Sequence, residues 1–226
     1  MDGTIRSWMV RLWPALLLAV AGCSYRGNID KPIARRLTWF SYIGGDDIRA
    51  ACGPGMLDWY RLVYNARYEE QLRTYEVVAD GAGGAILVAR VLGSTAPLHV
   101  VGAPLSPWRW ARSEARLDEA TFAAFEQTMV DSGFFEPLPV GLRLFSGDFW
   151  WVATGCIDEA FHFGAWRYTP DHAADLDFPA FLFVHDATGV PVNPPPARYQ
   201  RAFRSARVVL NPFRCAALHK FNLILS

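Results

Sequence analysis

Apolar and polar residues alternate with a period of two through much of the middle of the chain. Residues 59–65 and 72–77 follow this pattern and are rich in aromatic and β-branched residues, which is typical of strands. The run 85–92 is apolar enough to be buried on both faces, and the turn sequences Asp80-Gly81 and Gly83-Gly84 precede it. These three segments predict an antiparallel meander.

A helical period replaces the alternation after residue 117. Asp118 stands at the position of an N-cap, and Phe122, Phe125, Met129 and Val130 fall near one face of a helix. Gly133 provides a stop signal. The pattern predicts one main helix over residues 118–132.

Strand-like patterns return after this helix. We expect strands at 142–145, 149–154 and 160–168, and a further hairpin from 181–185 and 190–192. The neighbours Trp150 and Trp151 must point to opposite faces of their strand, so at least one of them has a position in the core. The order of strands, one helix and strands predicts an α+β fold, with a mostly antiparallel sheet packed against the helix at 118–132.

The N-terminus has the layout of an export signal. Arg6 and Arg11 precede an apolar run over residues 12–20, which ends in Ala21 and Gly22 before Cys23. The run is shorter than the roughly 20 apolar residues that a bilayer-spanning helix needs, and no basic cluster follows it. It therefore indicates a segment that is removed rather than a permanent membrane span.

The sequence Val20-Ala21-Gly22-Cys23 resembles the lipobox of bacterial lipoproteins, and the remainder resembles proteobacterial envelope lipoproteins of unknown function. The resemblance implies cleavage after Gly22, a diacylglyceryl thioether on Cys23 and acylation of the new amino terminus. It also implies sorting to the outer membrane rather than the inner one, because Ser24 and not Asp follows the cysteine. The alternative is an ordinary secretory signal with Cys23 unmodified.

Four regions follow from these patterns. Residues 1–22 are the signal peptide, 23–38 a lipid-anchored tether, 39–196 a single α+β domain and 197–226 a basic C-terminal segment. Beyond Asp186 there is no acidic residue, and six residues are basic: Arg198, Arg201, Arg204, Arg207, Arg214 and Lys220. This segment is either a contact for anionic headgroups or a solvated tail. The whole chain has 22 basic and 22 acidic residues, so its net charge indicates no nucleic-acid partner.

Three cysteines remain besides Cys23, and an oxidising compartment favours a disulfide between two of them. Cys52 and Cys156 both stand beside glycine at the expected ends of elements, whereas Cys215 lies in a tail of different composition. We therefore predict a disulfide between Cys52 and Cys156.

The remaining chemistry favours a non-enzymatic binding or structural protein of the cell envelope, with an envelope protein or glycan as its partner. The histidines are too widely spaced to indicate a metal site, and no cofactor motif is present. Residues 93–113 form an expected loop in which Trp108 and Trp110 can line a ligand groove, with core packing as the alternative for these rings. The competing hypothesis is a periplasmic hydrolase of a glycan or peptide that uses His162 or His172 beside an acidic residue.

Overall fold

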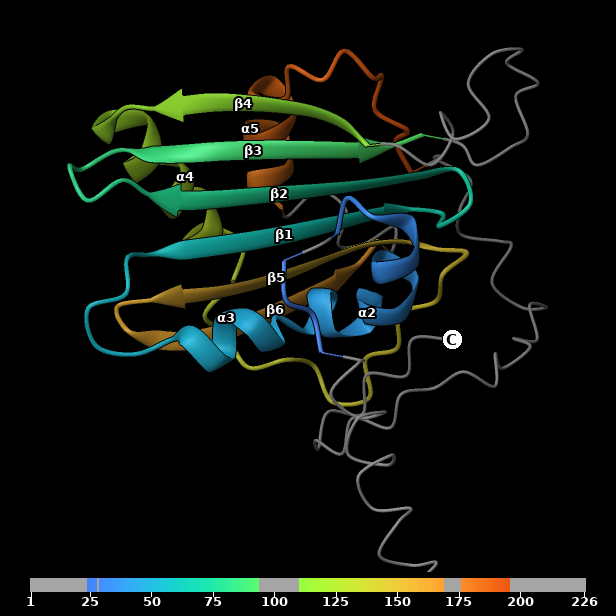
Figure 1. The fold of residues 1–226 in the computed structure, drawn as a ribbon, viewed down its shortest axis with the longest axis horizontal. Coiled ribbons are helices and arrows are strands. Elements are labelled where there is room, and N and C mark those ends of the chain that lie inside the picture. The colour runs from blue at the N-terminus through green and yellow to red at the C-terminus, as the bar shows by residue number, and fades with distance from the viewer. Residues whose placement is uncertain (1–23, 28, 94–109, 169–175, 196–226) are drawn as a thin grey trace, which may run out of the picture.

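A six-stranded antiparallel sheet forms the centre of the computed structural model, which describes residues 24–27, 29–93, 110–168 and 176–195. The strands lie in the order β4-β3-β2-β1-β5-β6 (Figure 1). Their bounds are β1 (Trp59–Ala66), β2 (Gln71–Ala79), β3 (Ala85–Leu92), β4 (Ala111–Leu117), β5 (Phe149–Ile157) and β6 (Ala160–Arg167).

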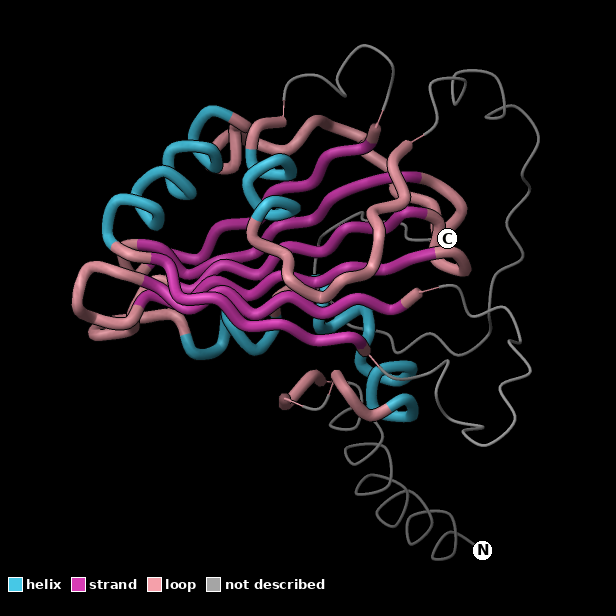
Figure 2. The backbone as a smooth tube through the Cα atoms, turned by 90° about the horizontal axis from the view of Figure 1, so that it is seen from above, coloured by secondary structure: helices cyan, strands magenta, loops and turns pink. Residues whose placement is uncertain are grey.

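Helices lie on both faces of this sheet (Figure 2). On one face are α2 (Pro32–Gly44) and α3 (Asp46–Ala51), and on the other are α4 (Glu119–Asp131) and α5 (Phe178–Val184). The predicted α+β class with an antiparallel sheet is confirmed. The prediction of one main helix is not confirmed, because α2 and α4 both have 13 residues.

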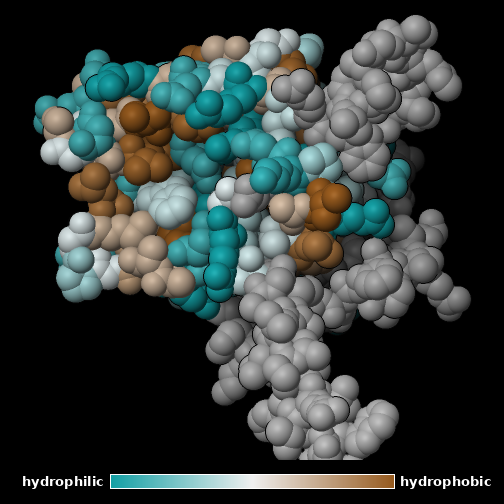
Figure 3. Space-filling model, viewed as in Figure 1, coloured by the Kyte–Doolittle hydropathy of each residue, from teal (hydrophilic) through white to brown (hydrophobic). Residues whose placement is uncertain are grey.

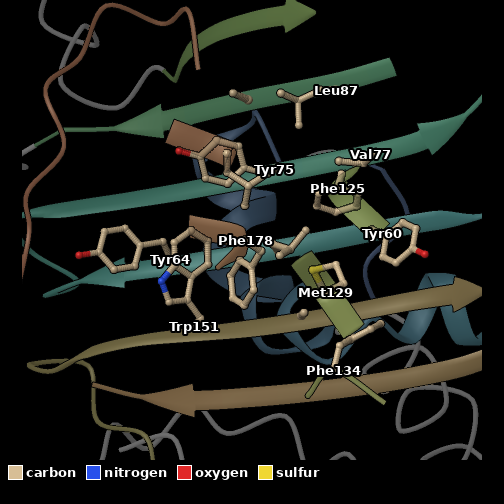
Figure 4. Packing of buried hydrophobic residues seen from close by; sticks show 14 of the residues in the cluster. Tyr60, Tyr64, Tyr75, Val77, Leu87, Phe125, Met129, Phe134, Trp151 and Phe178 are labelled. Carbon is tan, nitrogen blue, oxygen red and sulfur yellow. The ribbon is translucent and has the colours of Figure 1, made fainter. Parts of the chain in front are cut away.

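The alternation of side chains along the strands divides the core into two clusters. Trp151 lies in the cluster on the α4 and α5 face, with its ring centroid 4.7 Å from that of Tyr64 and 5.1 Å from that of Phe178 (Figure 4). Trp150 lies in the other cluster, on the α2 face. Both tryptophans are buried, so the prediction that neighbouring rings face opposite ways, with at least one in the core, is confirmed.

The predicted caps of α4 are present. The Asp118 side chain accepts a hydrogen bond from the backbone N–H of Thr121 at 2.8 Å, which satisfies a free donor of the first turn. Gly133 follows the helix with a φ of 71°, a conformation that glycine adopts without strain. Phe122, Phe125 and Met129 face the sheet and are buried, as the helical spacing predicts. Val130, which was predicted on the same face, is instead 53% exposed.

Three strand predictions were wrong in the second half of the chain. Residues 142–145 and 190–192 form no strand, and residues 181–184 belong to α5, in which Phe178 and Leu182 are buried one helical turn apart. Pro179 lies in the first turn of this helix, where proline is well tolerated. Strand β4 was missed, because its first residues fall in the segment expected to be a loop.

The segment that was expected to be a tether takes part in the fold. Tyr25 and Ile29 are buried, and α2 begins at Pro32. The polar and basic composition of residues 24–38, with Lys31-Pro32, favoured a tether, but proline fits the first helical positions because its missing N–H has no partner there. Two core residues, Tyr25 and Ile29, and the first turns of α2 therefore lie within the segment that was expected to be a tether.

The joint between α2 and α3 is held against β5 at Gly45. This residue has a φ of 65°, and a Cβ built on it would stand 2.7 Å from the Cβ of Thr154. Only glycine allows this approach without a clash. The close contact fixes both helices over the centre of the sheet.

Candidate functional site

The N-terminal segment is attached to the domain directly after the expected anchor. Cys23 lies outside the described residues, and Tyr25 is the first buried residue after it. The Tyr25 backbone N–H donates to the Ser41 hydroxyl at 2.9 Å, and its ring packs edge-on against Tyr42 at 4.8 Å. The chain therefore joins the α2 face of the domain within two residues of Cys23.

Trp110 supports the same attachment. Its indole N–H donates to the carbonyl oxygen of Ile29 at 3.1 Å, and the Arg35 guanidinium lies 5.2 Å from its ring centroid. Trp108 lies outside the described residues, so the predicted ligand groove at the two tryptophans stays a prediction. Within the described part, Trp110 binds the chain's own N-terminal segment.

A buried ion-pair network lies beneath this segment and is centred on Arg61. The Arg61 side chain is 1% exposed, and its guanidinium donates to both carboxylate oxygens of Asp47 at 2.7 Å. It also donates to Glu76 at 3.0 Å and to the carbonyl oxygen of Tyr42 at 3.1 Å. Three elements, α2, α3 and β2, are thus joined to β1 through one side chain. The bidentate geometry requires arginine and not lysine.

The surroundings of Arg61 fit a permanent cation. Its guanidinium carbon lies 4.0 Å from the Tyr42 ring centroid and 5.1 Å from that of Tyr25, so both rings contribute cation–π attraction. Burial opposes the charge, but the hydrogen bonds and charges of Asp47 and Glu76 outweigh it and raise the pKa of Arg61. Burial also raises the pKa of Tyr42, which stays a neutral phenol. We interpret this network as structural.

The predicted disulfide is confirmed in the structure. Cys52, directly after α3, is bonded to Cys156 on β5, which lies 104 positions further along the sequence, with a Cα–Cα distance of 5.5 Å. Next to it, the Gly55 N–H donates to the Glu159 carboxylate at 2.8 Å. The disulfide fastens the chain after the two N-terminal helices to the end of β5.

A second buried ion pair holds the segment after α5 against the other face of the sheet. The side chains of Arg73 and Asp186 are 1% and 2% exposed and form a salt bridge. Asp186 also accepts hydrogen bonds from the Tyr75 hydroxyl at 2.8 Å and from Thr188. Burial raises the pKa of Asp186, but the hydrogen bonds from Thr188 and Tyr75 and the charge of Arg73 outweigh it, and the net shift is downward.

This pair makes stability depend on pH. Because folding lowers the pKa of Asp186, its contribution is present above the unfolded value of about 3.9 and is lost as the pH falls through the folded value. Asp186→Asn is expected to lower the free energy of unfolding by about 2 kcal/mol at pH 7, since hydrogen bonds to a charged group are weakened. Urea unfolding from pH 7 to pH 2.5 measures this difference, which should shrink in acid. A difference independent of pH would contradict the assignment.

An open hollow of about 470 Å³ lies where α4 begins, and it is lined by Asp80, Ala82, Gly84, Arg116, Leu117, Asp118, Glu119, Thr121 and His185. Two of its carboxylates are used by the fold. Asp80 accepts the backbone N–H groups of Ala82 and Gly84 in a turn, and Asp118 caps α4. Hydrogen bonding from Thr121 lowers the pKa of Asp118. We interpret these carboxylates as turn and cap residues.

The two described histidines, His162 of the hydrolase hypothesis and His185, both have structural contacts. His162 packs edge-on against Phe135 at 4.9 Å, and burial lowers its pKa, although the charge of Asp158 acts in the opposite direction. His185 stacks on Phe181 at 4.2 Å. His172 lies outside the described residues. The described histidines therefore support core and surface packing, and none of their contacts indicates a catalytic dyad.

The described part of the chain contains neither a cluster that could hold a metal ion nor a helix that could cross a membrane. Within it, no three or more histidine, cysteine, aspartate or glutamate side chains gather in a way that could hold a metal ion. None of the helices described has the length and hydrophobicity needed to cross a bilayer.

Comparisons of the chain with protein-family models, with curated proteins and with solved structures give no match. Inference about function therefore depends on the chemistry of the residues described above.

Proposed function

We propose that the chain is an exported lipoprotein of the cell envelope, held at a membrane by lipid on Cys23. Its α+β domain then acts as a non-enzymatic binding or structural component that meets an envelope protein or glycan at the membrane surface. The observation that carries this proposal is the Cys52–Cys156 disulfide inside the domain. Structural disulfides persist in oxidising compartments outside the cytoplasm, and export is what the N-terminal segment and its lipobox predict.

The attachment of the N-terminal segment supports an anchor at this cysteine. Tyr25 and Ile29 are buried against α2, so the chain reaches the domain surface immediately after Cys23. A single acyl chain gives only marginal membrane binding, whereas a cysteine carrying three chains holds a protein firmly. Lipid at this position would therefore place the domain directly on the bilayer, where outer-membrane sorting is what Ser24 implies.

Mass spectrometry of the protein extracted from bacterial membranes tests the proposal. The expected N-terminal peptide begins at Cys23 and carries the mass of three acyl chains and one glycerol. Cys23→Ser should abolish the lipid mass and retain residues 1–22, whereas the control variant Cys215→Ser should leave both the cleavage and the lipid unchanged. An unmodified chain that begins at another residue would refute the anchor.

A further inference from the structure

Helix α2 has apolar side chains on two opposite faces. Its inner face packs on the sheet through Trp39, Tyr42 and Ile43, which are buried. Ile33, Leu37 and Phe40 point outward and are 77%, 57% and 60% exposed. These three residues, which we call the outer stripe, follow spacings of four and three and therefore lie on one side of the helix.

The outer stripe is unusual for a surface helix. The outward face of a helix packed on a core is normally polar, whereas a helix that is apolar on both sides is usually covered on both. Hydrophobic side chains accordingly gather over α2 on the outer surface of the molecule (Figure 3). The stripe therefore requires an apolar environment that the described part of the chain does not supply.

The position of the expected anchor indicates which environment this is. Only Ser24 separates Cys23 from Tyr25, whose backbone N–H is bonded to Ser41 of α2. Because an extended chain covers at most about 3.6 Å per residue, at most roughly 7 Å of backbone separates an anchor at position 23 from this contact. A lipid on Cys23 thus brings α2 itself to the bilayer.

The charges around the outer stripe complement a membrane surface. Arg26, Lys31 and Arg36 are exposed on the N-terminal segment and α2. The acidic Asp30 among them lies 3.5 Å from Arg90. Anionic headgroups attract basic side chains next to a membrane, and basic residues beside apolar ones are typical of helices that lie in the interface.

We propose that the outer stripe of α2 inserts into the boundary between headgroups and acyl chains of a membrane with anionic lipids, beside the lipid on Cys23. This inference rests on the proposed lipoprotein function and adds an orientation to it. With α2 in the interface, the α4 and α5 layer points away from the membrane (Figure 2). The acyl chains prevent dissociation, and the outer stripe prevents the domain from rotating freely.

Photo-crosslinking of the full-length protein in bacterial cells tests the orientation. Benzoylphenylalanine placed at position 37 or at position 40 is expected to form adducts with phospholipid, at least about tenfold more than at the control position 130. Val130 is a matched control because it is 53% exposed on α4, on the opposite side of the sheet. Two separate crosslinking positions guard against a local effect of the probe, and mapping of the Cys52–Cys156 disulfide verifies folding in each variant.

Mass analysis of Cys23 in the same samples separates the two proposals. Lipid on Cys23 together with phospholipid adducts at 37 and 40 supports both. Lipid on Cys23 with adducts at 37 and 40 only to protein, including residues 196–226 of this chain, would overturn the membrane contact of α2 and leave the anchor. Unmodified Cys23 with phospholipid adducts would refute the anchor and keep the contact.

Discussion

Replacing Cys52 and Cys156 together with alanine is expected to lower the free energy of unfolding by about 4 to 5 kcal/mol. The disulfide closes a loop across 104 positions, and the entropy that such a cross-link removes from the unfolded chain grows with loop length. The loss is a large fraction of the stability of an ordinary domain, about 5 to 15 kcal/mol. Urea unfolding of the detergent-purified protein, followed by tryptophan fluorescence, measures the loss.

Two comparisons control this experiment. Cys215→Ser removes a cysteine outside the predicted pair and should leave the unfolding midpoint unchanged. A reducing agent should shift the midpoint of the wild-type protein toward that of the double variant and leave the double variant unaffected. A wild-type midpoint that does not respond to full reduction would show that the cross-link contributes little to stability.

Arg61→Ala is expected to lower the free energy of unfolding by about 3 to 5 kcal/mol, the cost of breaking a buried ion pair on one side. The substitution removes the bidentate partner of Asp47 and one of the two arginine partners of Glu76. It also leaves a cavity beside the rings of Tyr25 and Tyr42, which both contact the guanidinium. Urea unfolding at pH 7 measures the loss.

Arg112→Ala is the matched control for this substitution. Arg112 also pairs with a carboxylate, that of Glu114, but both side chains are 54% exposed. Exposed pairs contribute at most about 1 kcal/mol, because water and salt screen them. Equal losses for the two variants would mean that the buried network around Arg61 adds nothing beyond an ordinary surface pair.

The sequence pattern was sufficient to predict five of the six strands of the described sheet. Strands β1, β2, β3, β5 and β6 all overlap predicted strands, because alternation and turn residues act locally. The same holds for α4, whose cap at Asp118 and stop at Gly133 are short-range signals. The Cys52–Cys156 pair was predicted from export and from neighbouring glycines, so long-range information came from chemistry rather than periodicity.

The buried arginines show why the rest could not be predicted. Arg61 lies between Tyr60 and Leu62, a position that alternation places on a solvated face, and Arg73 is also a charged residue within a strand, yet both side chains are 1% exposed. Their partners Asp47 and Asp186 lie 14 and 113 positions away in sequence, and no local pattern relates them. A polar position can be buried wherever the fold supplies an opposite charge, and only the tertiary structure shows that charge.

The exposed apolar face of α2 was not predicted from the sequence, for a related reason. Ile33, Leu37 and Phe40 repeat with the same helical spacing as residues on a core face, so a pattern of apolar positions does not separate an inward stripe from an outward one. In addition, the Lys31-Pro32 pair lies in the segment that was predicted to be a tether, so the start of the helix was not predicted. The structure places Tyr25 and the inner face of α2, including Trp39, in the core. The apolar residues on the other side of α2 are thereby identified as an exposed surface.

Strand β4 lies at one edge of the sheet, and its side chains affect how neighbouring copies of the protein interact when they are crowded together. β4 is an edge strand of the described sheet, and its outward positions are Arg112, Glu114 and Arg116. Copies confined to a membrane plane meet one another far more often than copies in free solution, and an open backbone edge invites strand pairing between neighbours. Alternating charges oppose such pairing by keeping water at the edge. If the protein is anchored as proposed, β4 would therefore resist pairing between copies at high surface density.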